Sequence, residues 1–259
     1  MVNIDLSGRR AFVTGGARGI GAGIVRVLAQ AGAAVAFTRL ASERDCCAAD
    51  ELVSGVTAGG GTVRCYEAAA EDMPAMQRTV QAAAESMGGL DLLVPNVGLT
   101  WKAPLEELEL DGWQRALDVN LTSAYIAVKC ALPWLVAAKR ADVVITGSSA
   151  VVDGGGGGIH DAAAKAGLDG MMRALMREFP RKGIHVNVIH PCVVDTDLLR
   201  ERYDTEEKRA GLAAQVPVGR LSRPEEIGYL VAFLCSDLGG FICGQSILVD
   251  GGRTFWRGV

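Results

Sequence analysis

A carboxylate and an ammonium lie four residues apart at Asp161 and Lys165, within residues 160–179, which have the apolar period of a helix. An unperturbed aspartic acid has a pKa of about 3.9, and a nearby ammonium favours its anion. Such an anion has no proton to give to a ketone, whereas it can accept a proton or stabilise a cation. Burial acts the other way and favours the neutral acid. We therefore expect Asp161 to act as an anion or a base rather than as a proton donor to a ketone.

A glycine-rich turn at residues 14–21 reads Thr-Gly-Gly-Ala-Arg-Gly-Ile-Gly, between the first predicted strand and the first predicted helix. Its glycines permit a tight turn and let the backbone approach a pyrophosphate, which the N-terminus of the helix then binds. Three glycines alone are a weak signal, but this setting makes the signal strong. The turn predicts a dinucleotide cofactor.

Alternating strands and helices must position these residues. Apolar segments rich in Val and Ile predict strands at residues 10–14, 34–38, 62–66, 91–94, 142–146, 185–189 and 246–249. Helical periodicity predicts helices at residues 19–31, 46–57, 74–86, 112–138, 160–179 and 224–234. This alternation implies parallel strands joined by right-handed crossovers. We predict one α/β domain over residues 1–259, a Rossmann-type doubly wound parallel sheet of about seven strands with helices on both faces.

Several segments, in order and at set distances, resemble those of the short-chain dehydrogenase/reductase family. They are residues 14–21, 95–98, 118–121, 147–149, 187–196 and 245–252. Residues 187–196, for example, resemble the Asn-x-x-x-Pro-Gly-x-x-x-Thr stretch that closes over the nicotinamide in that family. The resemblance implies cofactor contacts at Gly15, Arg18, Gly19, Ile20, Gly21, Arg39, Asn96, Gly98, Lys165, Pro191, Val194 and Thr196.

Residues 160–167 resemble the Tyr-x-x-x-Lys helix of the family, with Asp161 where the tyrosine is expected. In the family the tyrosine transfers the carbonyl proton, a serine positions the oxygen, the lysine binds ribose and an asparagine holds a relay water. Carried over, the last three roles fall on Ser148, Lys165 and Asn120. The predicted catalytic set is therefore Ser148, Asp161, Lys165 and Asn120.

Three functions fit this set. The first is an NADP(H)-dependent oxidoreductase with altered proton delivery, which reduces a small-molecule C=O or C=N bond. The second is a non-redox lyase, isomerase or cyclase that uses Asp161 as a base. The third is a catalytically silent cofactor-binding or regulatory protein. The retained Ser148, Asn120 and Lys165 favour the first.

Two arginines favour NADP(H) over NAD(H). The second strand ends at Arg39 with no acid to bind a ribose 2′-hydroxyl, and Arg18 lies inside the glycine turn. Ala69 and Ala70 stand where the family usually has an adenine-contacting Asp-Val, so the resemblance implies that this contact is lost.

Four neighbouring features each have two interpretations. His160 is either a proton shuttle or, as we favour, a side chain facing solvent or the pocket wall. His190 either lines the nicotinamide pocket or is structural. Cys192 is either a reactive thiol or, the favoured interpretation, a small residue in place of glycine. The five glycines at 154–158 form either a movable loop or an unconstrained turn.

Residues 193–221 correspond to the substrate segment of the family, and they contain neither a basic docking cluster nor a long lipophilic run. The sequence therefore predicts a small-molecule substrate without naming it. The resemblance implies a homotetramer or homodimer built on the fourth and fifth helices and the last strand. The tail at 255–256 either reaches a neighbouring subunit or packs within its own chain.

Charge and composition limit the binding partners and the cellular location that we expect for the protein. A net charge of −4 gives no reason to expect nucleic acid or an anionic membrane. The absence of a signal segment and of a membrane-length apolar run predicts a cytoplasmic protein. Seven scattered cysteines predict reduced thiols and no metal site.

Overall fold

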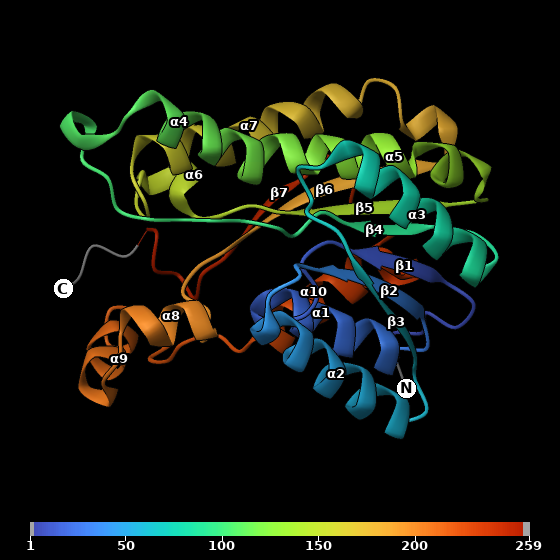
Figure 1. Cartoon of the computed structure of the whole chain (residues 1–259), viewed down its shortest axis with the longest axis horizontal. Coiled ribbons are helices and arrows are strands. Elements are labelled where there is room, and N and C mark those ends of the chain that lie inside the picture. Colours follow the sequence, from blue (N-terminus) through green and yellow to red (C-terminus); the bar gives the residue numbers. More distant parts are fainter. Residues whose placement is uncertain (1–2, 256–259) are drawn as a thin grey trace.

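The computed structural model describes residues 3–255, within which seven parallel strands form one sheet in the order β3-β2-β1-β4-β5-β6-β7 (Figure 1). The strands are β1 (Arg10–Val13), β2 (Ala34–Arg39), β3 (Thr62–Glu67), β4 (Leu92–Val94), β5 (Ala141–Thr146), β6 (Ile184–Pro191) and β7 (Ser246–Val249). The central strands are buried on both faces, as their continuous apolar runs require. The predicted doubly wound parallel sheet is confirmed.

Helices cover both faces of this sheet (Figure 1). One layer contains α1 (Gly19–Gln30), α2 (Glu43–Ala58) and α10 (Pro224–Cys235). The other contains α3 (Met73–Met87), α5 (Ser123–Ala137) and α7 (Ile159–Leu175). Each layer buries its apolar face against the sheet, and the two resulting cores hold the strand ends in place.

The fourth predicted helix is continuous from Leu110 to Ala137 and contains a π-helical turn. Its parts are α4 (Leu110–Leu117), the turn η2 (Asp118–Thr122) and α5. By length and composition it could cross a membrane, contrary to the expectation that no apolar run reaches that length. Half of its most apolar window is buried within the fold, where α5 packs on α3. The apolar composition therefore reflects a core helix.

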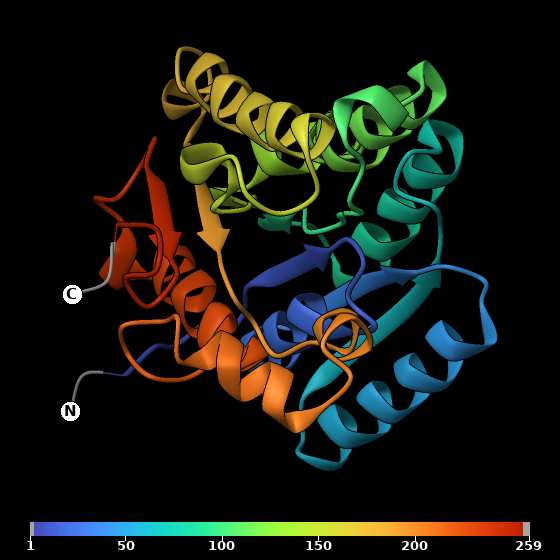
Figure 2. The same cartoon turned by 90° about the vertical axis from the view of Figure 1, so that its left-hand side faces the viewer.

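Short helices at the carboxyl end of the sheet escape prediction. They are α6 (Ala150–Asp153), α8 (Asp197–Arg202) and α9 (Glu206–Ala213), with a 3₁₀ turn at η1 (Leu105–Glu107). Two further 3₁₀ turns, η3 (Pro180–Lys182) and η4 (Asp237–Gly239), lie on the amino side of β6 and β7. Helices α8 and α9 are mainly polar and begin at Thr196 and Thr205, whose hydroxyls accept hydrogen bonds from Leu199 and Lys208 N–H groups. In Figures 1 and 2 they lie beside the sheet end, apart from the two helix layers.

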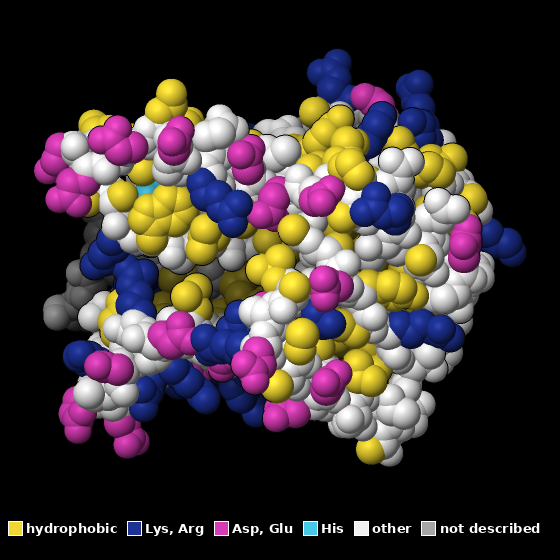
Figure 3. Space-filling model, in the orientation of Figure 1, with side chains coloured by type: hydrophobic (Ala, Val, Ile, Leu, Met, Phe, Trp, Pro, Cys, Tyr) yellow, Lys and Arg dark blue, Asp and Glu magenta, His cyan; other side chains and the backbone are white. Residues whose placement is uncertain are grey.

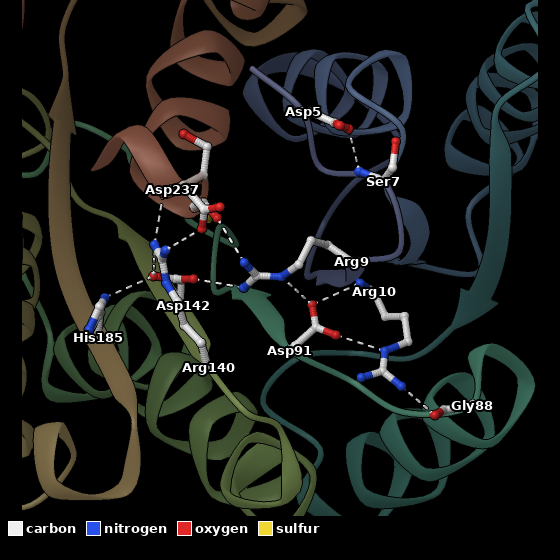
Figure 4. A network of polar contacts seen from close by, with 12 residues as sticks. Asp5, Ser7, Arg9, Arg10, Gly88, Asp91, Arg140, Asp142, His185 and Asp237 are labelled. Carbon is white, nitrogen blue, oxygen red and sulfur yellow. Dashed lines mark hydrogen bonds and ion pairs between the residues drawn. The ribbon is translucent and has the colours of Figure 1, made fainter. Parts of the chain in front are cut away.

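A network of ion pairs joins the opposite, amino end of the central strands (Figure 4). Asp142 accepts hydrogen bonds from Arg9 at 2.8 Å and Arg140 at 3.2 Å, and its side chain is 2% exposed. Asp91 accepts from Arg9 at 2.9 Å and Arg10 at 2.8 Å. These two buried carboxylates therefore clamp β1, β4 and β5 together at the end remote from the predicted site.

Only one of the two tail residues, 255 and 256, lies within the described part of the chain. Phe255 is 73% exposed and so does not pack within its own chain. Trp256 lies outside the described residues.

Candidate active site

The segment that follows β4 brings two predicted site residues together. The amide of Asn120 bonds both backbone groups of Leu99, accepting from its N–H at 2.9 Å and donating to its carbonyl at 2.8 Å. At Gly98, a Cβ atom would lie only 2.9 Å from Nζ of Lys165 and 3.2 Å from Oδ1 of Asn120. A side chain at this position would therefore displace the ammonium of the buried Lys165.

Thr100, which follows Leu99 in this loop, contacts Asp161. Its hydroxyl donates to Oδ2 of Asp161 at 3.3 Å. Residues 98–100 thus contact Lys165, Asn120 and Asp161 in turn, which places three of the four predicted catalytic residues around one short loop.

Asn120 reaches this loop from the π-helical turn η2, where it is 1% exposed. A π turn inserts one residue into a helix and is frequent at functional sites. Here it interrupts the helix so that the buried Asn120 amide meets the loop after β4.

Asp161 and Lys165 are both buried on the first turns of α7, at 3% and 6% exposure. Burial lowers the pKa of the Lys165 ammonium to about 8, although the attraction of Asp161 opposes this shift. Lys165 therefore exchanges its proton near physiological pH.

This shift predicts how stability depends on pH. Between pH 8 and 10.5 the unfolded chain keeps the Lys165 proton that the folded chain has released, so the contribution of Lys165 to stability rises with pH. This rise approaches about 3 kcal/mol across that range. Burial raises the pKa of the Cys235 thiol, which acts in the opposite direction at high pH, so urea unfolding at four pH values should show the rise as a difference between the cofactor-free wild type and Lys165→Met. The exposed Lys129, changed to Met as a control, should leave the slope intact; a wild-type slope no steeper than that of Lys165→Met would contradict the prediction.

Three of the five glycines at 154–158, Gly156 to Gly158, are closely packed, whereas Gly154 has open space around it. A Cβ atom on Gly156 would lie 2.9 Å from Oδ2 of Asp161, and one on Gly157 would lie 2.6 Å from the carbonyl oxygen of Trp101. The absence of side chains lets this loop close directly over the short Asp161 carboxylate.

His160 is fully buried, so the expectation that it faces solvent is wrong. Its ring packs on Trp101 with centroids 4.3 Å apart and an interplanar angle of 35°. Neither ring nitrogen finds a hydrogen-bond partner within residues 3–255. The residue lies inside α7 because helix formation starts at Ile159.

Ser148 is held by a buried histidine. Its backbone N–H donates to Nδ1 of His190 at 3.1 Å, while Nε2 of His190 lies 3.0 Å from Asp169 and 2.9 Å from Ser246. Because Nδ1 accepts, Nε2 carries the proton and donates. His190 is therefore structural and fixes the backbone at Ser148, one of the two interpretations of the sequence.

The glycine turn packs as predicted between the ends of β1, β2 and β4. Asn96 donates from Nδ2 to the carbonyl oxygens of Thr14 at 3.1 Å and Gly15 at 3.2 Å. The Gly15 N–H donates to the hydroxyl of Thr38 at 3.0 Å. Asn96 thus holds two carbonyl groups of the turn in place.

Both arginines of this region have acidic partners that the sequence did not indicate. Arg18 pairs with Asp45 of α2 at 2.5 Å, and Arg39 pairs with Glu67 at the end of β3 at 3.0 Å. Burial raises the pKa of Asp45, but hydrogen bonds from Ser42 and Arg18 outweigh it and leave this pKa below its usual value. Arg18 is therefore oriented by a buried anion.

The segment after β6 approaches the turn from the other side. β6 ends at the buried Pro191, and Val194 forms a bridge with Ser222. A Cβ atom on Gly19 would lie 3.3 Å from Cγ2 of Thr196. The predicted cofactor residues on this segment thus face the glycine turn across a narrow gap.

The turn suits a dinucleotide pyrophosphate. Helix α1 begins at Gly19 after Arg18, which provides no side-chain cap, so the first N–H groups of α1 remain available to an anion. Gly19, Ile20 and Gly21 supply these groups.

Comparison with known proteins agrees with this geometry. The family model described as Enoyl-(Acyl carrier protein) reductase matches residues 15–254. Cis-4-hydroxycyclohexanecarboxylate dehydrogenase of Sinomonas cyclohexanicum is 35% identical over 247 residues, covering 95% of this chain and 96% of that protein. A short-chain dehydrogenase/reductase from Serratia marcescens BCRC 10948 is 36% identical, with a TM-score of 0.88 over 96% of this chain and 99% of that chain.

A third match is a blue fluorescent protein from a metagenomic library, solved in complex with NADPH. It is 35% identical, with a TM-score of 0.86 over 96% of this chain and 99% of that chain. From the family model, the sequence identity and the shared fold, the chain belongs to the short-chain dehydrogenase/reductase family and is an oxidoreductase of that type.

Proposed function

We propose that this oxidoreductase uses NADP(H) to interconvert a small-molecule C–O or C–N single bond and the corresponding double bond, with proton delivery that does not depend on a tyrosine. The observation that carries the proposal is the contact of residues 98–100 with Lys165, Asn120 and Asp161. Bound NADPH would supply the hydride. The chain itself would hold the substrate oxygen or nitrogen and manage the proton.

In this proposal Lys165 holds the proton, and the Asp161 carboxylate beside it acts as a base or stabilises positive charge. Efficient acid–base groups have pKa values near the working pH, and Lys165, with a pKa of about 8, meets that condition. The charge of Asp161 attracts this ammonium and opposes the effect of burial on its pKa. Ser148, whose backbone is fixed by His190, would position the substrate oxygen or nitrogen.

Preference for NADP(H) rests on Arg18 and Arg39, which are 34% and 21% exposed. Both guanidinium groups lie at the end of β2, where a ribose 2′-phosphate would bind. The NADPH complex of a similar protein supports the same cofactor.

Fluorescence titration tests this preference. We expect NADPH to bind at least about tenfold more tightly than NADH, and Arg18→Gln to weaken NADPH by about tenfold while leaving NADH unchanged, because a charged hydrogen bond to phosphate is lost. Arg26→Gln, a change of the same charge in the same helix α1, should alter neither affinity. If neither nucleotide binds, the oxidoreductase proposal fails.

We also propose assembly into a homodimer or homotetramer. The face of α5 exposes Tyr125 and Val136, at 50% and 46%, and Phe241 next to β7 is fully exposed. Association of two copies would bury such exposed apolar side chains.

A further inference from the structure

A positively charged pocket of about 360 Å³ lies between the α8–α9 segment and the turn that follows β7. Its lining side chains are Arg202, Lys208, Arg253, Tyr203, Gln215 and Leu212. Lys208 bonds Asp204 at 2.6 Å, whereas Arg202 and Arg253 have no carboxylate partner within residues 3–255. The pocket thus offers cations that the rest of this segment does not neutralise.

The turn after β7 holds Arg253 in a defined place. Burial raises the pKa of Asp250, yet hydrogen bonds from Thr254, including its backbone N–H at 2.7 Å, bring this pKa below its usual value. Gly251 has a φ of +61°, and a Cβ atom there would lie 2.7 Å from Val216. The turn therefore packs against the segment that follows α9. This contact brings together the two segments that line the pocket.

Arg253 also contacts the chain just beyond β6. Its Nη1 donates to Sγ of Cys192 at 3.4 Å, and Cys192 directly follows β6. Two residues earlier, His190 accepts the backbone N–H of Ser148. Two residues of extended strand span about 6–7 Å. Arg253 thus contacts a residue that lies two positions along the chain from the histidine that holds the Ser148 backbone.

We propose that Arg253, with Arg202 and Lys208, binds the carboxylate of an anionic small-molecule substrate whose other end reacts near Ser148. This inference rests on the proposed function. A guanidinium binds a carboxylate through two parallel hydrogen bonds, and partial burial strengthens the attraction. The substrate named for the similar Sinomonas enzyme carries both a ring hydroxyl and a carboxylate.

Figure 3 shows Lys and Arg side chains, with Asp and Glu side chains among them, around the hollow on the same side of the molecule as α8 and α9. Neutral substrates would gain nothing from this field, whereas an anion would be attracted to it. The pocket therefore predicts selection by charge as well as by shape.

Calorimetric titration with two unreactive ring compounds tests the proposal without requiring turnover. We expect cyclohexanecarboxylate to bind the cofactor-free protein at least about tenfold more tightly than cyclohexanecarboxamide, which has the same shape and no charge. Arg253→Gln should bring the ratio to about one, and Arg253→Lys should retain part of it. Arg64→Gln removes the same charge from the edge strand β3 and should leave the ratio unchanged.

Three results would overturn the proposal: no carboxylate binding at about 10 mM ligand (roughly tenfold above the usual upper KM of about 1 mM), a wild-type ratio near one, or a ratio that survives Arg253→Gln. Because binding is measured without cofactor, these results are separate from a failure of nucleotide binding or turnover. A protein that selects the carboxylate but binds no NADPH would retain the anion site and refute only the oxidoreductase proposal.

Discussion

Asp161→Asn should reduce kcat about 100-fold while leaving NADPH affinity within about twofold, since a positioned acid–base group contributes at least this much. Asparagine preserves the size of the side chain and can still accept the hydrogen bond from Thr100. The substitution therefore removes charge and proton transfer more than packing. Reduction of a carboxylate-bearing cyclic ketone and of a cyclic imine, with NADPH in excess, measures the effect.

The same variant has a second signature in its pH dependence. Asp161 raises the pKa of Lys165 by charge attraction, so Asp161→Asn should lower that pKa below about 8. The pH at which the linked rise in stability begins should move to lower values by the same amount. A variant that lost activity through misfolding would lose NADPH binding as well.

Two outcomes would contradict the proposed role of Asp161. Unchanged turnover of every substrate in Asp161→Asn would show that the carboxylate takes no part. Ketone reduction that appears only in Asp161→Tyr would instead indicate that the wild-type protein has lost catalysis. That variant requires the loop at 154–158 to move, because Gly156 and Gly157 pack directly on the Asp161 side chain.

Asp142→Asn should lower the free energy of unfolding by about 3 kcal/mol, the usual cost of removing one partner from a buried ion pair. Arg9 and Arg140, which are 20% and 24% exposed, would be left facing each other without their shared carboxylate (Figure 4). Urea unfolding at pH 7 measures the loss. Because the network lies at the amino end of the strands, NADPH affinity should not change.

Asp237→Asn provides the matched control. Asp237 also pairs with Arg140, at 3.0 Å, but its side chain is fully exposed. Exposed ion pairs contribute about 0–1 kcal/mol, so this variant should stay within 1 kcal/mol of wild type. Equal losses in the two variants would mean that burial of Asp142 does not determine its contribution.

Periodicity and turn chemistry in the sequence determined most of the architecture. All seven strands and six helices lie where the apolar patterns placed them, because a buried parallel strand and an amphipathic helix each leave a local pattern. The glycine turn was likewise evident from residues 14–21 alone. The short helices α8 and α9 were missed because their stability depends on polar caps and on packing, which periodicity does not reveal.

Only the tertiary structure decided which partners the charged side chains contact. Arg18 and Asp45 are separated by 27 residues, and Arg253 and Cys192 by 61, so no local pattern links them. The burial that lowers the pKa of Lys165 also arises from the packing of α7 against the loop after β4. The sequence by itself determined that Asp161 and Lys165 share a helix. The folded chain determined that both are buried, that glycines close over the carboxylate, and that a cluster of cations forms beyond β6, because desolvation and long-range charge contacts exist only once distant segments are packed together.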